Sequence, residues 1–168
     1  MRVLGIDPGS QRCGYGVVEK KERGIELIGA GVIELDPAPL KERIKEVTEG
    51  LELVYSRYSP IDLVVIEDIF FAHNPQSVLK LAQIRGAIAL KMLQLHGDYL
   101  QFTPLQVKRV ITGNGKASKE QVAYMVRKIL KLGEVIKPFD ITDALGIALT
   151  PLLLKLAPLP LPVGVDRV

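Results

Sequence analysis

The first third of the chain consists of short apolar segments separated by turn residues, a pattern typical of β-strands. Residues 2–7 form one such segment, and two longer ones follow at Cys13–Glu19 and Ile25–Glu34. The charged, glycine-containing stretch 20–24 separates the second from the third. Short strands joined by turns of this kind pair with their neighbours in sequence. The pattern therefore predicts a three-stranded antiparallel meander.

From residue 39 onward the apolar residues recur at helical spacing. They return every three or four positions from Pro39 to Tyr58, which predicts a helix. Leu63–Ile66 is a continuous apolar run, as expected for a strand covered on both faces. The later predicted elements are a helix over 74–96, a strand over 98–102, a short helix over 104–111, a helix opened by a Ser118–Gln121 capping box, and a last helix from about 140 to 156.

A meander followed by alternating helices and strands predicts an α/β fold. The sheet should be mixed and five-stranded, with helices on both faces. The first and fourth strands should be parallel neighbours, so that their carboxyl ends meet at one edge. We expect a single domain over residues 1–157. Pro158, Pro160 and Pro162 alternate with apolar residues, which predicts a flexible, proline-rich tail over 158–168.

Composition narrows the class of protein further. Hydrophobic residues make up 48% of the 168 residues and charged residues 24%, which is typical of a globular chain. The single cysteine, Cys13, excludes an intrachain disulfide and suits a reducing compartment. We expect no secretory leader, because the chain opens directly on an apolar strand, and its apolar stretches are too short to span a membrane. We therefore expect a soluble, cytoplasmic protein.

Four carboxylates stand where the predicted fold would bring them together. Asp7 and Glu67 are the last residues of the first and fourth predicted strands. Asp140 and Asp143 lie at the start of the last predicted helix, three residues apart, so they can share one face of that helix. Each has an ordinary alternative role, in a turn, at a strand end or as a helix cap. Together at one sheet edge they would repel one another unless a cation lay between them. Carboxylate oxygens are the ligands that Mg²⁺ and Mn²⁺ prefer.

Basic residues are concentrated in one later segment. The chain carries a net charge of +3, but residues 108–131 alone contain seven bases against one acid, Glu120, a net charge of +6. Such a segment beside an acidic pocket suits a polyanionic substrate handled with metal ions, although an ordinary solvated helix face is an equal alternative. The candidate phosphate contacts are Lys108, Lys116 and Lys119, together with Arg85.

Several motifs, which follow one another along the chain in the order given below, resemble those of RuvC, a family of Holliday junction resolvases. The resemblance covers nearly the whole chain except the proline-rich tail. The matching residues are Gly5-Ile6-Asp7-Pro8-Gly9-Ser10, Gly14-Tyr15-Gly16, Ile66-Glu67 with Phe70, Ala72 to Asn74, Ser77, Leu79-Lys80-Leu81, Gln106-Val107-Lys108, Gly113-Asn114-Gly115, Lys119, Gln121-Val122 and Asp140 to Ala144.

The resemblance implies a ribonuclease H-like fold and a homodimeric endonuclease that nicks opposing strands of a four-way DNA junction. It also implies that Asp7, Glu67, Asp140 and Asp143 are the catalytic metal ligands. Two Mg²⁺ ions, replaceable by Mn²⁺, would supply the hydrolytic chemistry, and Lys119 would meet the developing negative charge. RuvA and RuvB, which drive branch migration, are the implied partners.

Aromatic residues and small residues suggest two further roles. Phe70 and Phe71 follow the Glu67 strand, and an exposed ring there would stack on an unpaired base. The resemblance favours this role for Phe70, whereas Phe71 is expected to pack in the core. In the helix over 74–96, Gly86, Ala87 and Ala89 permit close helix approach, which suits a two-fold dimer.

Three alternatives remain open on sequence grounds. Gly5-Ile6-Asp7-Pro8-Gly9 also resembles the first phosphate loop of actin and sugar-kinase ATP-binding domains, although 168 residues is short for that class. A nuclease with another nucleic-acid substrate and a non-catalytic junction-binding protein are the others. Asp68 stands where the family often has Gln, and strand alternation predicts that only one of Glu67 and Asp68 points at the site.

Overall fold

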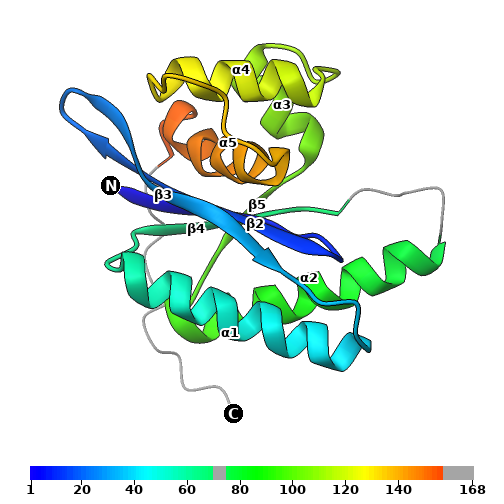
Figure 1. The fold of residues 1–168 in the computed structure, drawn as a ribbon. Coiled ribbons are helices and arrows are strands. Elements are labelled where there is room, and N and C mark those ends of the chain that lie inside the picture. The colour runs from blue at the N-terminus through cyan, green and yellow to red at the C-terminus, as the bar shows by residue number, and fades with distance from the viewer. Residues whose placement is uncertain (70–74, 157–168) are drawn as a thin grey trace.

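The computed structural model describes residues 1–69 and 75–156, which form five strands and five helices (Figure 1). The strands are β1 (Arg2–Asp7), β2 (Arg12–Lys21), β3 (Gly24–Glu34), β4 (Leu63–Glu67) and β5 (Leu100–Phe102). The helices are α1 (Leu40–Tyr58), α2 (Pro75–His96), α3 (Pro104–Thr112), α4 (Lys119–Ile129) and α5 (Phe139–Leu153).

The strands form one mixed sheet in the order β3-β2-β1-β4-β5. The pairs β1–β2 and β2–β3 are antiparallel, which confirms the predicted meander. The pairs β1–β4 and β4–β5 are parallel. β1 and β4 are therefore parallel neighbours at the centre of the sheet, as the sequence predicted, and their carboxyl ends meet at the same edge.

Helices cover both faces of the sheet, and each face has its own hydrophobic core. In Figure 1, α1 and α2 lie on one side of the sheet and α3, α4 and α5 on the other. Alternate residues of β1 enter opposite cores: Val3 packs with α3, α4 and α5, whereas Leu4 packs with α1 and α2. The predicted α/β fold, with helices on both faces of a five-stranded sheet, is confirmed.

Glycines in the strands allow α5 to lie directly on the sheet. A Cβ atom built on Gly5 would overlap the backbone of Ala144 and Ala148, and one built on Gly16 would overlap Leu145. Glycine inside a strand often marks such a close backbone approach. With any larger residue at these positions, α5 would have to move away from β1 and β2.

Most element boundaries follow the predictions, with two differences. The fifth strand is confined to Leu100–Phe102, and just before it the Asp98 carboxylate accepts a hydrogen bond from the Tyr99 amide. The last helix ends at Leu153, earlier than predicted. Pro151 lies within its last turn and has no amide hydrogen to continue the helical bonding.

The capping box at Ser118 and Gln121 is present as predicted, and Thr103 and Gln106 form a second one at the start of α3. Asn74, the first residue of the predicted helix over 74–96, lies outside the described residues, as do Phe70, Phe71 and the tail over 158–168. None of the helices in the described part of the chain has the length and apolar character needed to cross a membrane.

Candidate active site

Two of the predicted acids lie at the ends of adjacent strands. Asp7 is the last residue of β1 and Glu67 the last residue of β4. The register pairs Ile6 with Ile66, so the two acids follow matched positions on parallel neighbours. Their proximity is a direct consequence of the sheet topology.

The first turn of α5 brings the other two acids to the same edge. A Cβ atom on Gly14 would overlap the Asp140 carbonyl, so the start of α5 lies against the end of β2 that pairs with Asp7. Asp143 lies one helical turn after Asp140. Gly14 of β2 thus determines how near Asp140 and Asp143 approach the sheet.

Three of the four acids line one cavity of about 240 Å³. Its other walls come from α3 and α4. The lining residues are Asp7, Glu67, Pro104, Val107, Lys108, Lys119, Val122 and Asp143. Asp140 is not among them, so it lies beside the cavity rather than in its wall. The cavity therefore combines three carboxylates, two ammonium groups and an apolar rear wall.

The carboxylates are hard to ionise together in this setting. Burial raises the pKa of Asp7 well above its ordinary value, and the charges of Glu67 and Asp143 raise it further. Burial and the charge of Asp143 likewise raise the pKa of Glu67 to about 7. Burial is also the main cause that raises the pKa of Asp143. A group of buried acids with raised pKa values is typical of a functional site.

Lys119 partly neutralises this group of acids. Its Nζ donates a hydrogen bond to Oδ2 of Asp143 at 3.0 Å. Partial burial alone would lower the pKa of Lys119, but the hydrogen bond and charge of Asp143, together with the charges of Asp7 and Asp140, raise it. Lys119 is the first residue of α4, and the capping box of Ser118 and Gln121 fixes where that helix begins. The local sequence thus aims the ammonium group at the acids.

The donor set of the cavity suits a hard divalent cation. All the acidic ligands offered by the cavity are oxygens, as Mg²⁺ and Mn²⁺ prefer. Within residues 1–69 and 75–156, no three His, Cys, Asp or Glu side chains are arranged closely enough to hold one ion. Asp7, Glu67 and Asp143 nevertheless line the same cavity.

The structure separates the basic segment into two groups. Lys108 and Lys119 line the cavity, and Lys116 is exposed in the loop between α3 and α4. Arg127 and Lys128, in contrast, lie over the ring of Tyr124 near the end of α4. Only part of the predicted basic surface therefore adjoins the acids.

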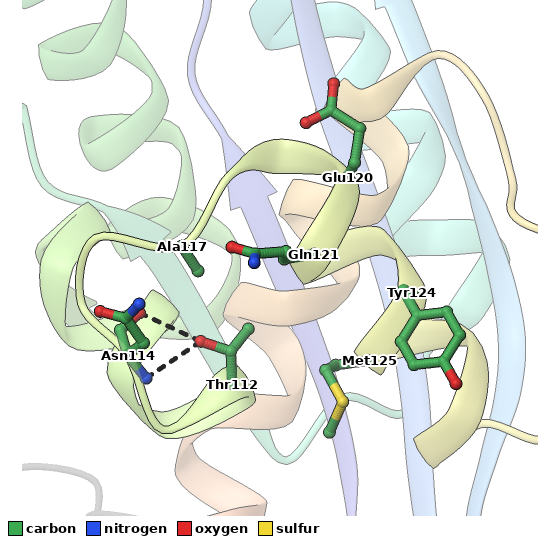
Figure 2. A pocket seen from close by; sticks show the side chains of 7 residues that line it. All are labelled: Thr112, Asn114, Ala117, Glu120, Gln121, Tyr124 and Met125. Carbon is green, nitrogen blue, oxygen red and sulfur yellow. Dashed lines mark hydrogen bonds between the residues drawn. The ribbon is translucent and has the colours of Figure 1, made fainter.

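A second hollow, of about 390 Å³, lies between α4 and the loop before it, and Figure 2 shows its lining side chains. The Asn114 amide donates to the Thr112 hydroxyl at 3.1 Å, and the Asn114 carboxamide oxygen accepts from the Lys116 amide at 2.9 Å. These bonds hold the loop that carries Lys116. None of the four clustered acids lines this hollow, so it is distinct from the candidate active site.

Arg85 has partners other than those expected. Its side chain is 14% exposed and lies 3.3 Å from an oxygen of Asp68. Asp68 lines a smaller neighbouring cavity and not the one that holds Asp7 and Asp143. Neither these contacts of Arg85 nor the structural role of Gly5 and Gly14 was identified from the sequence. Glycine within an apolar strand pattern was a signal for the latter.

Comparison with known proteins assigns the chain to a family. The family model described as crossover junction endodeoxyribonuclease RuvC matches residues 3–151. A protein of that name from Campylobacter curvus (strain 525.92) is 57% identical over 150 residues, which cover 89% of this chain and 95% of the relative. One from Aliarcobacter butzleri (strain RM4018) is 56% identical over 89% of this chain and 97% of its own.

Solved structures give the same result. Thermus thermophilus RuvC has a TM-score of 0.82 at 34% identity, covering 92% of this chain and 95% of that one. Its complex with a Holliday junction substrate has a TM-score of 0.81 at 32% identity, with the same coverage. The fowlpox virus resolvase in complex with junction DNA, at 17% identity and a TM-score of 0.59, shares the fold.

Proposed function

Because the chain belongs to the RuvC family of crossover junction endodeoxyribonucleases, we propose that it resolves four-way DNA junctions in recombination and repair. The reaction is a metal-dependent hydrolysis that nicks two opposing strands. The observation that carries this proposal is the cavity in which Asp7, Glu67, Asp143 and Lys119 meet. An ATP-binding role of the actin or sugar-kinase kind has no comparable support.

The acids act as the metal ligands in this proposal. Asp7, Glu67 and Asp143 hold Mg²⁺, or Mn²⁺ in its place, through carboxylate oxygens, and Asp140 supports them from beside the cavity. Two bound ions would activate a water molecule and neutralise charge on both the attacking and leaving oxygens. The raised pKa values of Asp7 and Glu67 support this role, since a cation would relieve their mutual repulsion.

The lysines bind and neutralise the DNA backbone. Lys119 exchanges its bond to Asp143 for a phosphate oxygen and stabilises negative charge during cleavage. Lys108, in the same cavity wall, and Lys116, in the nearby loop, contact flanking phosphates. Such contacts give affinity that falls with salt but carry little sequence information. Phe70, outside the described residues, is proposed to stack on a base at the crossover.

A homodimer would supply the two active sites that paired nicks require. One face of α2 carries Leu79, Leu90 and Leu93, which are 64%, 58% and 45% exposed. Gly86 lies on the same face and has open space around it. Ala89, in contrast, packs into the core with α1. An apolar stripe around a central glycine suits the matching helix of a second copy.

A nuclease assay with matched substrates tests the proposed activity. We expect paired nicks in a synthetic four-way junction with Mg²⁺, and none with EDTA or in Asp7→Asn. Loss of one of three clustered ligands should reduce the rate by at least about a hundredfold. Asp7→Asn should still bind junctions in a gel-shift assay, because Lys108, Lys116 and Lys119 remain.

Three outcomes of these experiments would contradict parts of the proposal. Equal cutting of a linear duplex would exclude junction selectivity. Retained cleavage in Asp7→Asn would exclude the proposed metal site. A monomer in sedimentation at micromolar concentration, both with and without junction DNA, would exclude the dimer.

Two further proposals rest on family membership rather than on contacts. RuvA and RuvB are the proposed branch-migration partners, and co-sedimentation of the three proteins on a junction would test that assembly. A cytoplasmic location is proposed because the substrate is DNA and the single cysteine requires no oxidising compartment.

A further inference from the structure

The side chain of Arg85 reaches from α2 to the end of β4 and the middle of β5. Its Nε donates to the backbone carbonyl oxygen of Glu67 at 3.0 Å. One terminal nitrogen donates to Oε1 of Gln101 at 2.9 Å, and the same nitrogen lies 3.3 Å from Oδ1 of Asp68. One side chain therefore ties together α2, the end of β4 and the middle of β5.

The end of β4 needs such an anchor because the regular strand pairing stops there. Glu67 is the last residue of β4, and its pairing with Phe102 is the last in the β4–β5 ladder. After it, the Asp68 amide donates to the Phe102 carbonyl at 2.8 Å. The peptide plane between Glu67 and Asp68 is held from its other side by Arg85, through the Glu67 carbonyl oxygen.

Orientation of that peptide plane determines where the Glu67 carboxylate points. Side-chain direction in a strand follows the backbone, so a rotation at the strand end would turn the carboxylate away from Asp7 and Asp143. A hydrogen bond from a charged guanidinium is stronger than one from a neutral donor, which suits it to resist that rotation. Arg85 is also largely buried, so its position is fixed by packing.

Asp68 has a separate role in this arrangement. Its Oδ1 accepts from the Ile69 amide at 3.0 Å and faces Arg85. Asp68 lines the smaller cavity together with Glu67, and neither Asp7 nor Asp143 lines that cavity. The aspartate next to Glu67 therefore balances the charge of Arg85 instead of adding a fourth ligand to the cavity.

We propose that Arg85 is a positioning residue for Glu67, with Asp68 as its counter-ion and Gln101 as its second anchor. This inference rests on the proposed function, in which Glu67 is a metal ligand. It assigns Arg85 to the geometry of the active site instead of to the DNA backbone, where the sequence had placed it.

The test compares substitutions of Arg85 with a control on the same helix. Arg85→Lys keeps the charge but cannot make the planar, forked contacts, and Arg85→Gln removes the charge. Gln101→Ala and Asp68→Asn each remove one anchor and keep the core intact. Lys91→Gln is the control, because Lys91 of α2 makes an ion pair of 2.8 Å with Glu52 of α1, away from β4.

Three quantities are measured on the full-length protein. They are Mn²⁺ affinity without DNA by calorimetry, the single-turnover rate of junction cleavage against Mg²⁺ concentration, and junction affinity in EDTA. Both Arg85 variants should lose about 10- to 100-fold in metal affinity and cleavage rate, the range typical of residues that orient metal ligands. Gln101→Ala and Asp68→Asn should lose only about two- to fivefold. Junction affinity in EDTA and all values for Lys91→Gln should stay within about twofold of the unsubstituted protein.

Each opposite result overturns a stated part of the proposal. If Arg85→Lys binds Mn²⁺ as tightly as the unsubstituted protein, Arg85 does not position Glu67, even where its melting temperature falls. If junction affinity in EDTA falls in step with cleavage, Arg85 is a phosphate contact. If Asp68→Asn loses as much Mn²⁺ affinity as Glu67→Gln, Asp68 is a ligand. Failure of the unsubstituted protein to nick junctions would instead overturn the proposed function, while the Mn²⁺ measurement would still test the positioning role.

Discussion

The two most apolar helices, α5 and α2, lie on opposite sides of the sheet and are covered very differently. All residues of α5 from Ala144 to Leu152 are buried, because α5 lies between the sheet and the helices α3 and α4. Only one face of α2 is buried, with Ile84, Ile88 and Met92 against the α1 side of the core. The other face exposes a stripe of leucines. Helices of similar apolar composition thus differ: α5 is buried in a core, whereas α2 presents an apolar stripe that is exposed within the described part of the chain.

The contrast also explains where the proposed catalytic groups lie. Because α5 lies directly against Gly5 and Gly14, the acids at its start approach the strand ends closely. Arg85 of α2 instead contacts the strand end through a long side chain. Helix α5, which carries two of the proposed ligands, lies against the sheet through backbone contacts. Helix α2 contacts the proposed ligand Glu67 through the long side chain of Arg85.

Substitution of a glycine under α5 should have the largest effect. Gly5→Ala places a methyl group against the Ala144 carbonyl and the Ala148 amide, neither of which can rotate away. We expect a loss of roughly 3 kcal/mol or more in the free energy of unfolding, as for severe overpacking. Chemical denaturation measures the loss. Stability equal to that of the unsubstituted protein would mean that α5 has room to move.

The acids between α5 and the sheet should make the metal-free protein less stable as pH rises. The pKa of Glu67 is raised from its ordinary 4.5 to about 7 in the folded state. Below about pH 4.5 Glu67 is protonated in both the folded and the unfolded state. Between about pH 4.5 and pH 7 it has lost its proton only in the unfolded state, which favours unfolding. The full loss, reached above about pH 7, amounts to about 3 kcal/mol.

Thermal melts in EDTA at about pH 5 and about pH 8 measure this effect, and Mg²⁺ should restore stability at the higher pH. Glu67→Gln is the control, because a neutral amide removes the contribution of Glu67 and should weaken the dependence, while the raised pKa values of Asp7 and Asp143 maintain the rest. A metal-free protein that is more stable at the higher pH would contradict the raised pKa of Glu67.

The exposed face of α2 should show the smallest effect on folding and a distinct effect on assembly. Gly86→Ala adds a methyl group in open space and should stabilise the isolated chain by about 0.5–1 kcal/mol, as for glycine inside a helix. If two α2 helices meet at this residue, the same methyl group should weaken the dimer. Sedimentation and denaturation of this variant, beside Gly5→Ala, separate the two roles of glycine. A dimer affinity equal to that of the unsubstituted protein would place the interface elsewhere.

The sequence by itself determined the elements and the order in which they pair. Apolar periodicity and caps such as Ser118 with Gln121 are local signals, so they predict helices and strands without knowledge of the fold. The meander and the later alternation of strand and helix predicted that β1 and β4 are parallel neighbours. That topology was enough to predict that Asp7 and Glu67 end side by side.

Only the tertiary structure decided which side chains become partners. It turned Asp68 toward Arg85, set Asp140 beside the cavity instead of in its wall, and separated Arg127 from the bases near the acids. These outcomes depend on packing between residues far apart in the chain, such as α5 against the strand glycines. No local sequence pattern specifies these long-range contacts, because a side chain can adopt several orientations until the residues that pack against it are in place.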